Sequence, residues 1–84
     1  MMDKVLIEIY VPVLEETYDM FIPLSSPMHE VLELVKKAVV ELSDGRFYAD
    51  GSTAICHRED GTIININMSV YELEIKNGSK LMLI

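Results

Sequence analysis

Two stretches near the N-terminus alternate apolar and polar side chains with the period of two that is typical of strands. The first, residues 4–11, places four β-branched side chains on one parity: Val5, Ile7, Ile9 and Val11. Residues 17–24 alternate in the same way, and Pro12 and two glutamates separate the two stretches. Because a short polar break between two alternating runs is typical of a turn, the pattern predicts an antiparallel hairpin.

The next segment changes to the three- and four-residue spacing of a helix. The apolar residues at this spacing are Met28, Val31, Leu32, Val35, Ala38, Val39 and Leu42. They form one stripe, so residues 28–43 predict a helix with a buried face. Serine can cap free helix amides and proline tolerates the first helical position, so Ser25, Ser26 and Pro27 indicate the start. Asp44-Gly45 indicates the end, because glycine can adopt the left-handed conformation.

The middle of the chain carries weaker signals. Residues 46–53 have no clear period and predict a loop from which Phe47 or Tyr48 packs under the sheet. Two short runs, residues 54–59 and 62–67, flank Asp60-Gly61. This dipeptide suits a type I′ turn, in which both positions need positive φ, so the runs predict a second hairpin.

The last part of the chain predicts a connector and one more strand. Residues 69–75 are compact enough for a helical turn, Asn77-Gly78 predicts a tight turn, and residues 80–84 alternate again. The resulting order, a hairpin, a helix, a second hairpin and a final strand, is not the repeated βαβ order of parallel-sheet proteins. We therefore expect an α+β fold of the β-grasp type, with a mixed sheet of four to five strands packed on one helix and the last strand parallel to the first.

The closing segment supports this fold by resemblance. From Val70 to Ile84 a short turn, an isoleucine, a tight turn and an alternating strand follow each other, as they do at the end of ubiquitin-like domains. Residues 17–23, Pro27 and the first half of the helix resemble the bacterial EsaB/YukD family of ubiquitin-like proteins. This resemblance implies an accessory role in type VII (WXG100) secretion, a cytoplasmic location and a protein partner, which could be a component of the secretion machinery.

Conjugated modifiers and sulfur carriers of the ubiquitin-like class expose a C-terminal diglycine, which an activating enzyme adenylates. The sequence printed here ends at Leu83-Ile84, within the predicted last strand. We therefore expect neither conjugation nor sulfur transfer, in agreement with what the EsaB/YukD resemblance implies.

Size and charge narrow the possible partners. The 84 residues are enough for one small core, so we expect a single domain, residues 1–84. The formal net charge of −7 opposes phosphate backbones and anionic lipids, so nucleic acid and membrane surfaces are poor partners. The N-terminal run is broken by Glu8 and Pro12, unlike a signal peptide, and no apolar stretch reaches the ~20 residues that span a bilayer.

Candidate chemistry is sparse. Cys56 is the only cysteine, which rules out an internal disulfide and a cysteine-ligated cluster. Its neighbour His57 would point to the opposite face of a strand, so the two side chains do not form a nucleophile and base. The turn carboxylates have no EF-hand spacing; they are Asp44, Asp50, Glu59 and Asp60. We expect no catalytic residues, no bound metal, no cofactor and no enzymatic activity.

Apolar residues on the side of the sheet that the helix leaves open are the candidate site. If Val5, Ile7 and Ile9 face the helix, the residues of opposite parity face away from it. The candidate protein-binding residues are Leu6, Tyr10, Phe21, Ile55, Met82 and Ile84. Exposed apolar patches of several hundred Å² usually mark interaction sites. The favoured function is thus a non-enzymatic adaptor or regulator of type VII secretion; the alternative is a homodimerising or complex-assembly module unrelated to secretion.

Overall fold

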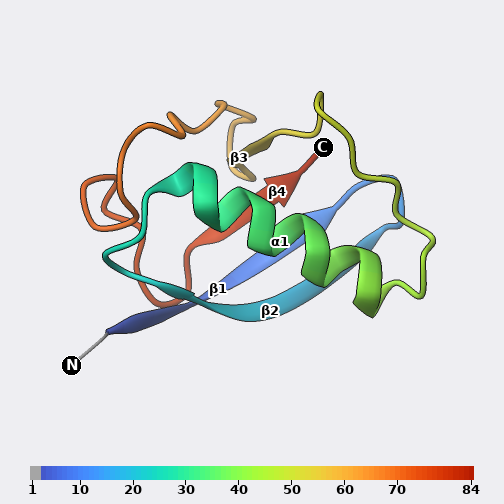
Figure 1. Cartoon of the computed structure of the whole chain (residues 1–84), viewed down its shortest axis with the longest axis horizontal. Helices are drawn as coiled ribbons and strands as arrows, with labels where there is room; N and C mark the ends of the chain where they lie inside the picture. The colour runs from blue at the N-terminus through green and yellow to red at the C-terminus, as the bar shows by residue number, and fades with distance from the viewer. Residues whose placement is uncertain (1–2) are drawn as a thin grey trace.

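The computed structural model of the chain describes residues 3–84. One helix crosses one face of a four-stranded sheet with strand order β2-β1-β4-β3 (Figure 1). The elements in chain order are β1 (Lys4–Val11), β2 (Glu16–Pro23), α1 (Met28–Leu42), β3 (Ile55–His57) and β4 (Lys80–Leu83). The predicted α+β class, a mixed sheet packed on one helix, is confirmed. Residues 1 and 2, which begin both the predicted domain and the segment compared with a signal peptide, lie outside the described residues.

Strand β1 occupies the centre of the sheet because it pairs on both sides. It runs antiparallel to β2, with Leu6 opposite Phe21, and parallel to β4, with Ile9 opposite Leu81. The even-numbered residues of β1 bond toward β4: the amide of Gly78 donates to the carbonyl of Leu6, and the amide of Glu8 donates to the carbonyl of Ser79. The predicted first hairpin and the predicted parallel last strand are both confirmed.

The core lies between the sheet and α1. Its fully buried large side chains come from all five elements and from one connector: Ile7, Ile9, Val11, Ile22, Met28, Val31, Val35, Val39, Ile55, Val70, Leu81 and Leu83. The predicted stripe of α1 supplies the helical members of this core, but Leu42 is 59% exposed, so its predicted burial is wrong: it is the last helical residue, where the chain turns away. Burial of a side chain of this size contributes about 1.5–3 kcal/mol, so the core between α1 and the sheet is the main source of stability.

The start of α1 differs from the sequence prediction. The N-cap residue is Pro27, in an extended conformation, and no serine side chain caps the helix. The free amides of Met28 and His29 instead donate to the carbonyls of Met68 and Ile66, at 2.8 and 2.9 Å. A distant loop therefore satisfies the groups that local capping usually satisfies. The predicted serine cap is wrong because Pro27 pairs with Ser69 in an isolated bridge, which holds this loop against the helix.

The end of α1 follows the prediction closely. The last helical residue is Leu42, one residue earlier than expected. Asp44 and Gly45 both have positive φ, 57° and 80°, and the amide of Gly45 donates to the carbonyl of Val40 at 2.9 Å. This six-residue closure is the Schellman motif, in which a left-handed residue allows the chain to turn back.

The second hairpin forms only in part. Strand β3 has three residues, and in the described chain residues 62–67 contribute a single isolated bridge, from Ile63 to Cys56, in place of a strand. The Asp60-Gly61 turn is not type I′, because Gly61 alone has positive φ; its amide donates to the carbonyl of His57 at 2.9 Å. This wider turn removes the two-residue connection that a longer hairpin requires.

Two loops attach to the core as the sequence suggested. Phe47 is buried whereas Tyr48 is 81% exposed, so Phe47 is the aromatic residue that packs inward. The connector after residue 68 forms one helical turn with a capping box: the Glu72 amide donates to Ser69 Oγ, and the Ser69 amide donates to Glu72 Oε1. The turn closes through a 3.3 Å bond from the amide of Ile75 to the carbonyl of Val70.

Removal of the Ser69 hydroxyl should weaken this connector. We expect Ser69→Ala to lower the free energy of unfolding by about 1 kcal/mol, because the Glu72 amide loses its cap. Urea denaturation followed by circular dichroism measures the change. Ser25→Ala is the matched control, since Ser25 is exposed and has no hydrogen bond within residues 3–84; an equal loss in both variants would contradict the assigned cap.

The same capping box predicts a pH dependence. Hydrogen bonds from the Ser69 amide and hydroxyl lower the pKa of Glu72 below its ordinary value near 4.5. A carboxyl whose pKa is depressed by folding stabilises the protein above its unfolded pKa, and this contribution is lost as the pH falls through the folded pKa. The stability of the wild type should therefore fall more steeply than that of Glu72→Gln below about pH 4.5, in urea melts at pH 3–7. Parallel curves would exclude the effect.

Candidate protein-binding surface

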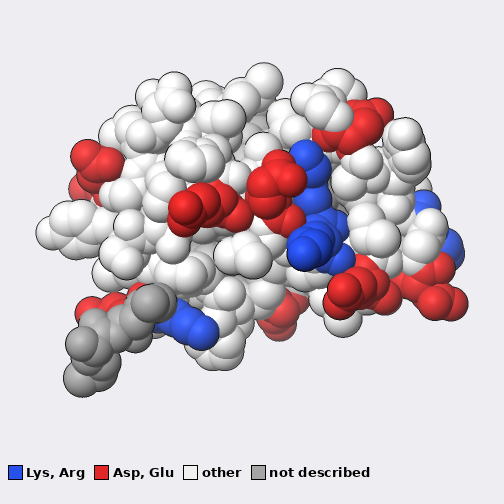
Figure 2. Space-filling model, in the orientation of Figure 1, with Lys and Arg blue, Asp and Glu red and all other residues white. Residues whose placement is uncertain are grey.

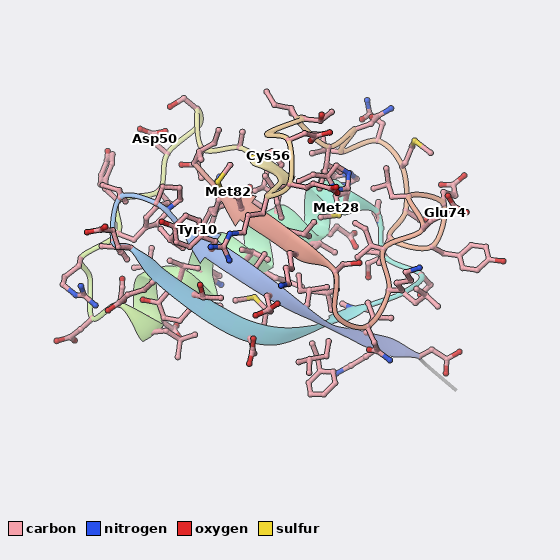
Figure 3. The ribbon with its side chains drawn as sticks, turned by 180° about the vertical axis from the view of Figure 1, so that it is seen from behind. Tyr10, Met28, Asp50, Cys56, Glu74 and Met82 are labelled. Atoms are coloured by element: carbon pink, nitrogen blue, oxygen red, sulfur yellow. The ribbon has the colours of Figure 1, made fainter. Side chains whose placement is uncertain are left out.

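The side of the sheet that faces away from α1, here called the open face, carries alternate residues of three strands. These residues are Leu6, Glu8, Tyr10, Thr17, Asp19, Phe21, Lys80, Met82 and, just beyond β4, Ile84. They face outward because the residues that alternate with them in β1 and β4 are buried under the helix. In Figure 3, which views the molecule from behind, Tyr10 and Met82 lie on this side of the sheet.

One end of the open face is an apolar pair. Leu6 and Phe21 are direct cross-strand partners, 38% and 65% exposed. Their backbones do not bond to each other, since Leu6 accepts from the amide of Gly78 and donates to Asn77 Oδ1 at 2.7 Å. Side chains of such non-hydrogen-bonded pairs approach closely, so Leu6 and Phe21 form one apolar surface.

A charged row crosses the middle of the open face. Glu8 is paired with Asp19 on one side and with Lys80 on the other, and Lys80 Nζ lies 3.9 Å from Glu8 Oε2. All three side chains are partly or fully exposed, so the ion pair adds little stability. Two carboxylates to one ammonium leave this row acidic.

The other end of the open face is built around Tyr10. Its neighbour in the register is Met82, and the guanidinium of Arg58 lies 4.2 Å from the centre of its ring. This distance is that of a cation–π contact, which holds Arg58 across the sheet. Ile84 continues the parity of Met82, is 51% exposed and is fastened by two backbone bonds to Ala54.

The structure places five of the six candidate residues on the open face, in two groups that the charged row separates. Leu6 and Phe21 form one group, and Tyr10, Met82 and Ile84 form the other. Ile55 is the exception: it is 1% exposed and pairs with the core residue Leu83. The prediction that Ile55 faces outward is therefore wrong. The next residue, Cys56, lies on the open-face side instead, because Cys56 and not Ile55 pairs with the outward-facing Met82.

Cys56 pairs with Met82 and is fully buried. Its Sγ donates to the carbonyl of Met82 at 3.6 Å. Burial, and secondarily the charge of Asp60, raise the pKa of the thiol, which opposes formation of the reactive thiolate. His57 pairs with Leu81 and so belongs to the opposite parity. The two side chains do not face each other.

The turn carboxylates bind their own backbone. Asp50 accepts from the amide and hydroxyl of Ser52, and Asp60 accepts from the amide of Thr62. These bonds lower the pKa of both carboxyls. Between residues 3 and 84, no three His, Cys, Asp or Glu side chains converge on a possible metal position. No helix in the same range has the length and apolar character needed to cross a membrane.

Two features of the surface escaped the sequence analysis. The contact of Arg58 with Tyr10 joins a turn to a strand 48 residues earlier, and no local pattern indicates it. The charged row was detectable, since Glu8 and Lys80 have the parity of the candidate residues. Their presence divides what would otherwise be one apolar patch.

No protein-family model matches the sequence, and no curated protein matches it significantly. Solved structures do match the fold. The ubiquitin-like domain of the Mycobacterium tuberculosis type VII secretion protein EccD1 is similar with a TM-score of 0.78 and 18% identity, over 99% of both chains. The EccD5 ubiquitin-like domain from Mycobacterium xenopi has a TM-score of 0.72 and 22% identity, over 98% of this chain and 93% of that one.

A structure of another class matches comparably. A chain in the toluene 4-monooxygenase HD complex with the inhibitor 4-bromobenzoate has a TM-score of 0.76 and 11% identity, over 96% of both chains. At these identities the similarity concerns the fold. The chain has the ubiquitin-like β-grasp fold that its sequence predicts, and the same fold occurs in proteins with different roles.

Two isoleucines test the corrected placement. We expect Ile55→Ala to cost about 2–5 kcal/mol of unfolding free energy, because it leaves a cavity in the core. Ile84→Ala, at the half-exposed edge of the open face, should cost less than about 1 kcal/mol. Urea denaturation of both variants measures the difference, and equal costs would contradict the burial of Ile55.

Proposed function

We propose that this chain is a non-enzymatic protein-binding module of a type VII (WXG100) secretion system, of the EsaB/YukD kind. The observation that carries the proposal is the fold similarity to two EccD ubiquitin-like domains, which extends over almost the whole chain. The resemblance of residues 17–23 and of the first half of the helix to EsaB/YukD proteins points to the same secretion system. The module acts in the cytoplasm and binds a component of the machinery there.

The open face is the surface that this function uses. Phe21 and Leu6 expose a large part of their side chains at one end, and Ile84 does so at the other. Aromatic and aliphatic side chains that lie exposed on a rigid sheet can contact a partner with little loss of conformational entropy. The acidic row between the two groups adds orientation, because it favours a basic side chain of the partner at one defined position.

The properties of the chain support binding as its role. The thiol of Cys56 is buried with a raised pKa, and its neighbour His57 faces away from it. The net charge of −7 disfavours nucleic acid and anionic membrane as partners. A protein surface of opposite charge is the complementary partner.

A second candidate function is a complex-assembly module outside secretion, including assembly as a homodimer. The observation that favours it is the comparable fold similarity to a chain of the toluene 4-monooxygenase complex. The two candidates differ in the partner that the open face binds. Identification of that partner therefore separates them.

Charge substitutions on the open face test the proposal. We expect Phe21→Glu combined with Ile84→Glu to abolish capture of a secretion ATPase or membrane component from native lysate, because both apolar groups then carry a buried charge at the interface. The circular dichroism spectrum should remain that of the wild type, since both positions are exposed. Mass spectrometry identifies the captured proteins.

Tyr48→Glu is the matched control, because Tyr48 is more exposed than either residue and lies in the loop before β3. Capture by the control and the wild type, with loss in the double variant, supports the open face. Equal capture by all three proteins would contradict that assignment. Capture of only further copies of the chain, seen as a dimer in light scattering, would favour the second candidate.

A further inference from the structure

The sheet has one long edge whose backbone groups are free. Strand β2 is the first strand in the order β2-β1-β4-β3, so only one of its sides is paired within the described chain. The opposite edge is short and covered. Strand β3 has three residues, the amide of His57 donates to the carbonyl of Thr62, and the amide of Ile64 donates to the carbonyl of Ile55. We propose that the free edge of β2 binds an extended, basic segment of another protein as a fifth strand.

The register identifies the groups that point outward. The amide of Leu24 bonds to the carbonyl of Asp3, so this pair and every second pair after it are the bonded pairs of the β1–β2 ladder. The residues of β2 whose backbones bond to β1 are therefore Ile22, Met20, Tyr18 and Glu16. Thr17, Asp19 and Phe21 direct their N–H and C=O groups away from the sheet, and these groups have no partner among residues 3–84. Three donors and three acceptors in a row form a template for an added strand.

Strand β2 has few of the features that usually block such pairing. Natural edge strands are short or carry lysine, proline or a bulge. Strand β2 has eight residues and an unbroken register with β1, and it contains no lysine. Its one proline, Pro23, is its last residue, beyond the three outward-bonding positions. The charged residues of β2, Glu16 and Asp19, are both acidic, so an edge of this length disfavours acidic strands and suits a basic one.

The helix provides an apolar wall beside this edge. The flank of α1 that contains Lys36 and Val40 lines a hollow together with Ala49, so it faces the loop toward β3. Because successive helix residues are rotated by about 100°, Leu34 lies on the opposite flank of α1. The strand that α1 approaches there is β2. Leu34 is 53% exposed, and Tyr18 and Met20 of β2 are half-buried on the same side of the sheet. Apolar side chains of an added strand would pack between them.

Charge identifies the occupant. Glu30 lies toward the same helix flank as Leu34, whereas Glu41 lines the hollow on the opposite flank with Lys36 and Val40. Asp19 lies on the open-face side of the edge. Figure 2 shows acidic side chains spread over the helix side of the molecule, whereas basic ones gather in fewer places. A strand added here therefore has Glu30 on its helix side and Asp19 on its open-face side, while Glu16 at the start of β2 is already paired with Arg46 at 2.9 Å. It fits a segment with apolar residues at every second position, toward Leu34, and lysine or arginine at the positions between, toward Asp19.

A second copy of the chain is a poor occupant. Pairing of two β2 strands about a two-fold axis centred on the outward-bonding residues places Asp19 opposite Asp19 of the other copy, and like charges directly opposite destabilise a sheet. Each copy also brings a net charge of −7. The edge of β2 therefore binds a basic segment by backbone pairing, in addition to the contacts of the open face proposed above and whichever system the partner belongs to.

Amide hydrogen exchange by NMR tests the proposal, with a capped nine-residue peptide of alternating valine and lysine as the probe. In the free protein the amides of Thr17, Asp19 and Phe21 should exchange fast, whereas those of Tyr18 and Met20 should exchange slowly because they bond to β1. At saturating peptide, exchange at the three outward amides should slow by roughly tenfold or more, since each gains a backbone bond. A control peptide of the same length, with glutamate in place of lysine, should not slow exchange at these amides.

Three variants keep the test decisive. Asp19→Lys should weaken binding of the lysine peptide by roughly tenfold and favour the glutamate peptide, whereas Glu59→Lys, with the same change in net charge but far from β2, should not. Thr17→Pro removes one outward donor and leaves the bonded pairs of β1 intact, so it should weaken binding of the lysine peptide. Unchanged exchange at the three amides with millimolar lysine peptide would overturn the proposal. So would shifts confined to Leu6, Tyr10 and Met82, which would assign the peptide to the open face.

Discussion

The structure depends on the two-sided pairing of β1. Its odd-numbered side chains are buried under α1, and its even-numbered residues bond to β4 and the turn before it. A strand with both edges paired and one face covered has a single exposed face. In β1 the side chains on that face are Lys4, Leu6, Glu8 and Tyr10. The same pairing leaves β2 at the edge, because β1 has no further side to offer. Both candidate binding surfaces are consequences of this one arrangement.

The two surfaces differ in what they can recognise. The open face presents side chains on a rigid sheet, and its charged row divides Leu6 and Phe21 from Tyr10, Met82 and Ile84. It favours a partner that contacts two apolar groups across a polar centre. The edge presents backbone groups, whose geometry is independent of sequence, so its selectivity comes from Asp19 and Glu30. Thr17, Asp19 and Phe21 belong to both surfaces, which means that one partner can use both.

The alternation of side chains along the strands predicted the outward direction of five of the six candidate residues and failed for Ile55. Leu6, Tyr10 and Phe21 lie in long alternating strands, where one inward residue determines the direction of all the others. Ile55 begins a three-residue strand whose neighbours include Cys56, so both successive residues are apolar and buried. The phase of so short a strand is set by its pairing with Leu83, 28 residues later, and no periodicity in residues 54–59 carries that information.

The elements with strong local periodicity could be predicted from the sequence: the first hairpin, the amphipathic helix with its Asp44-Gly45 stop, and the α+β class. Their signals are local because propensity and hydrophobic period act over a few residues. Features that depend on distant partners appear only in the folded chain. The carbonyls of Ile66 and Met68 replaced a serine cap, β4 set the phase of β3, and Arg58 covered Tyr10. Each of these contacts joins residues 24 to 48 positions apart, and chain closure over such distances is determined by packing of the whole core.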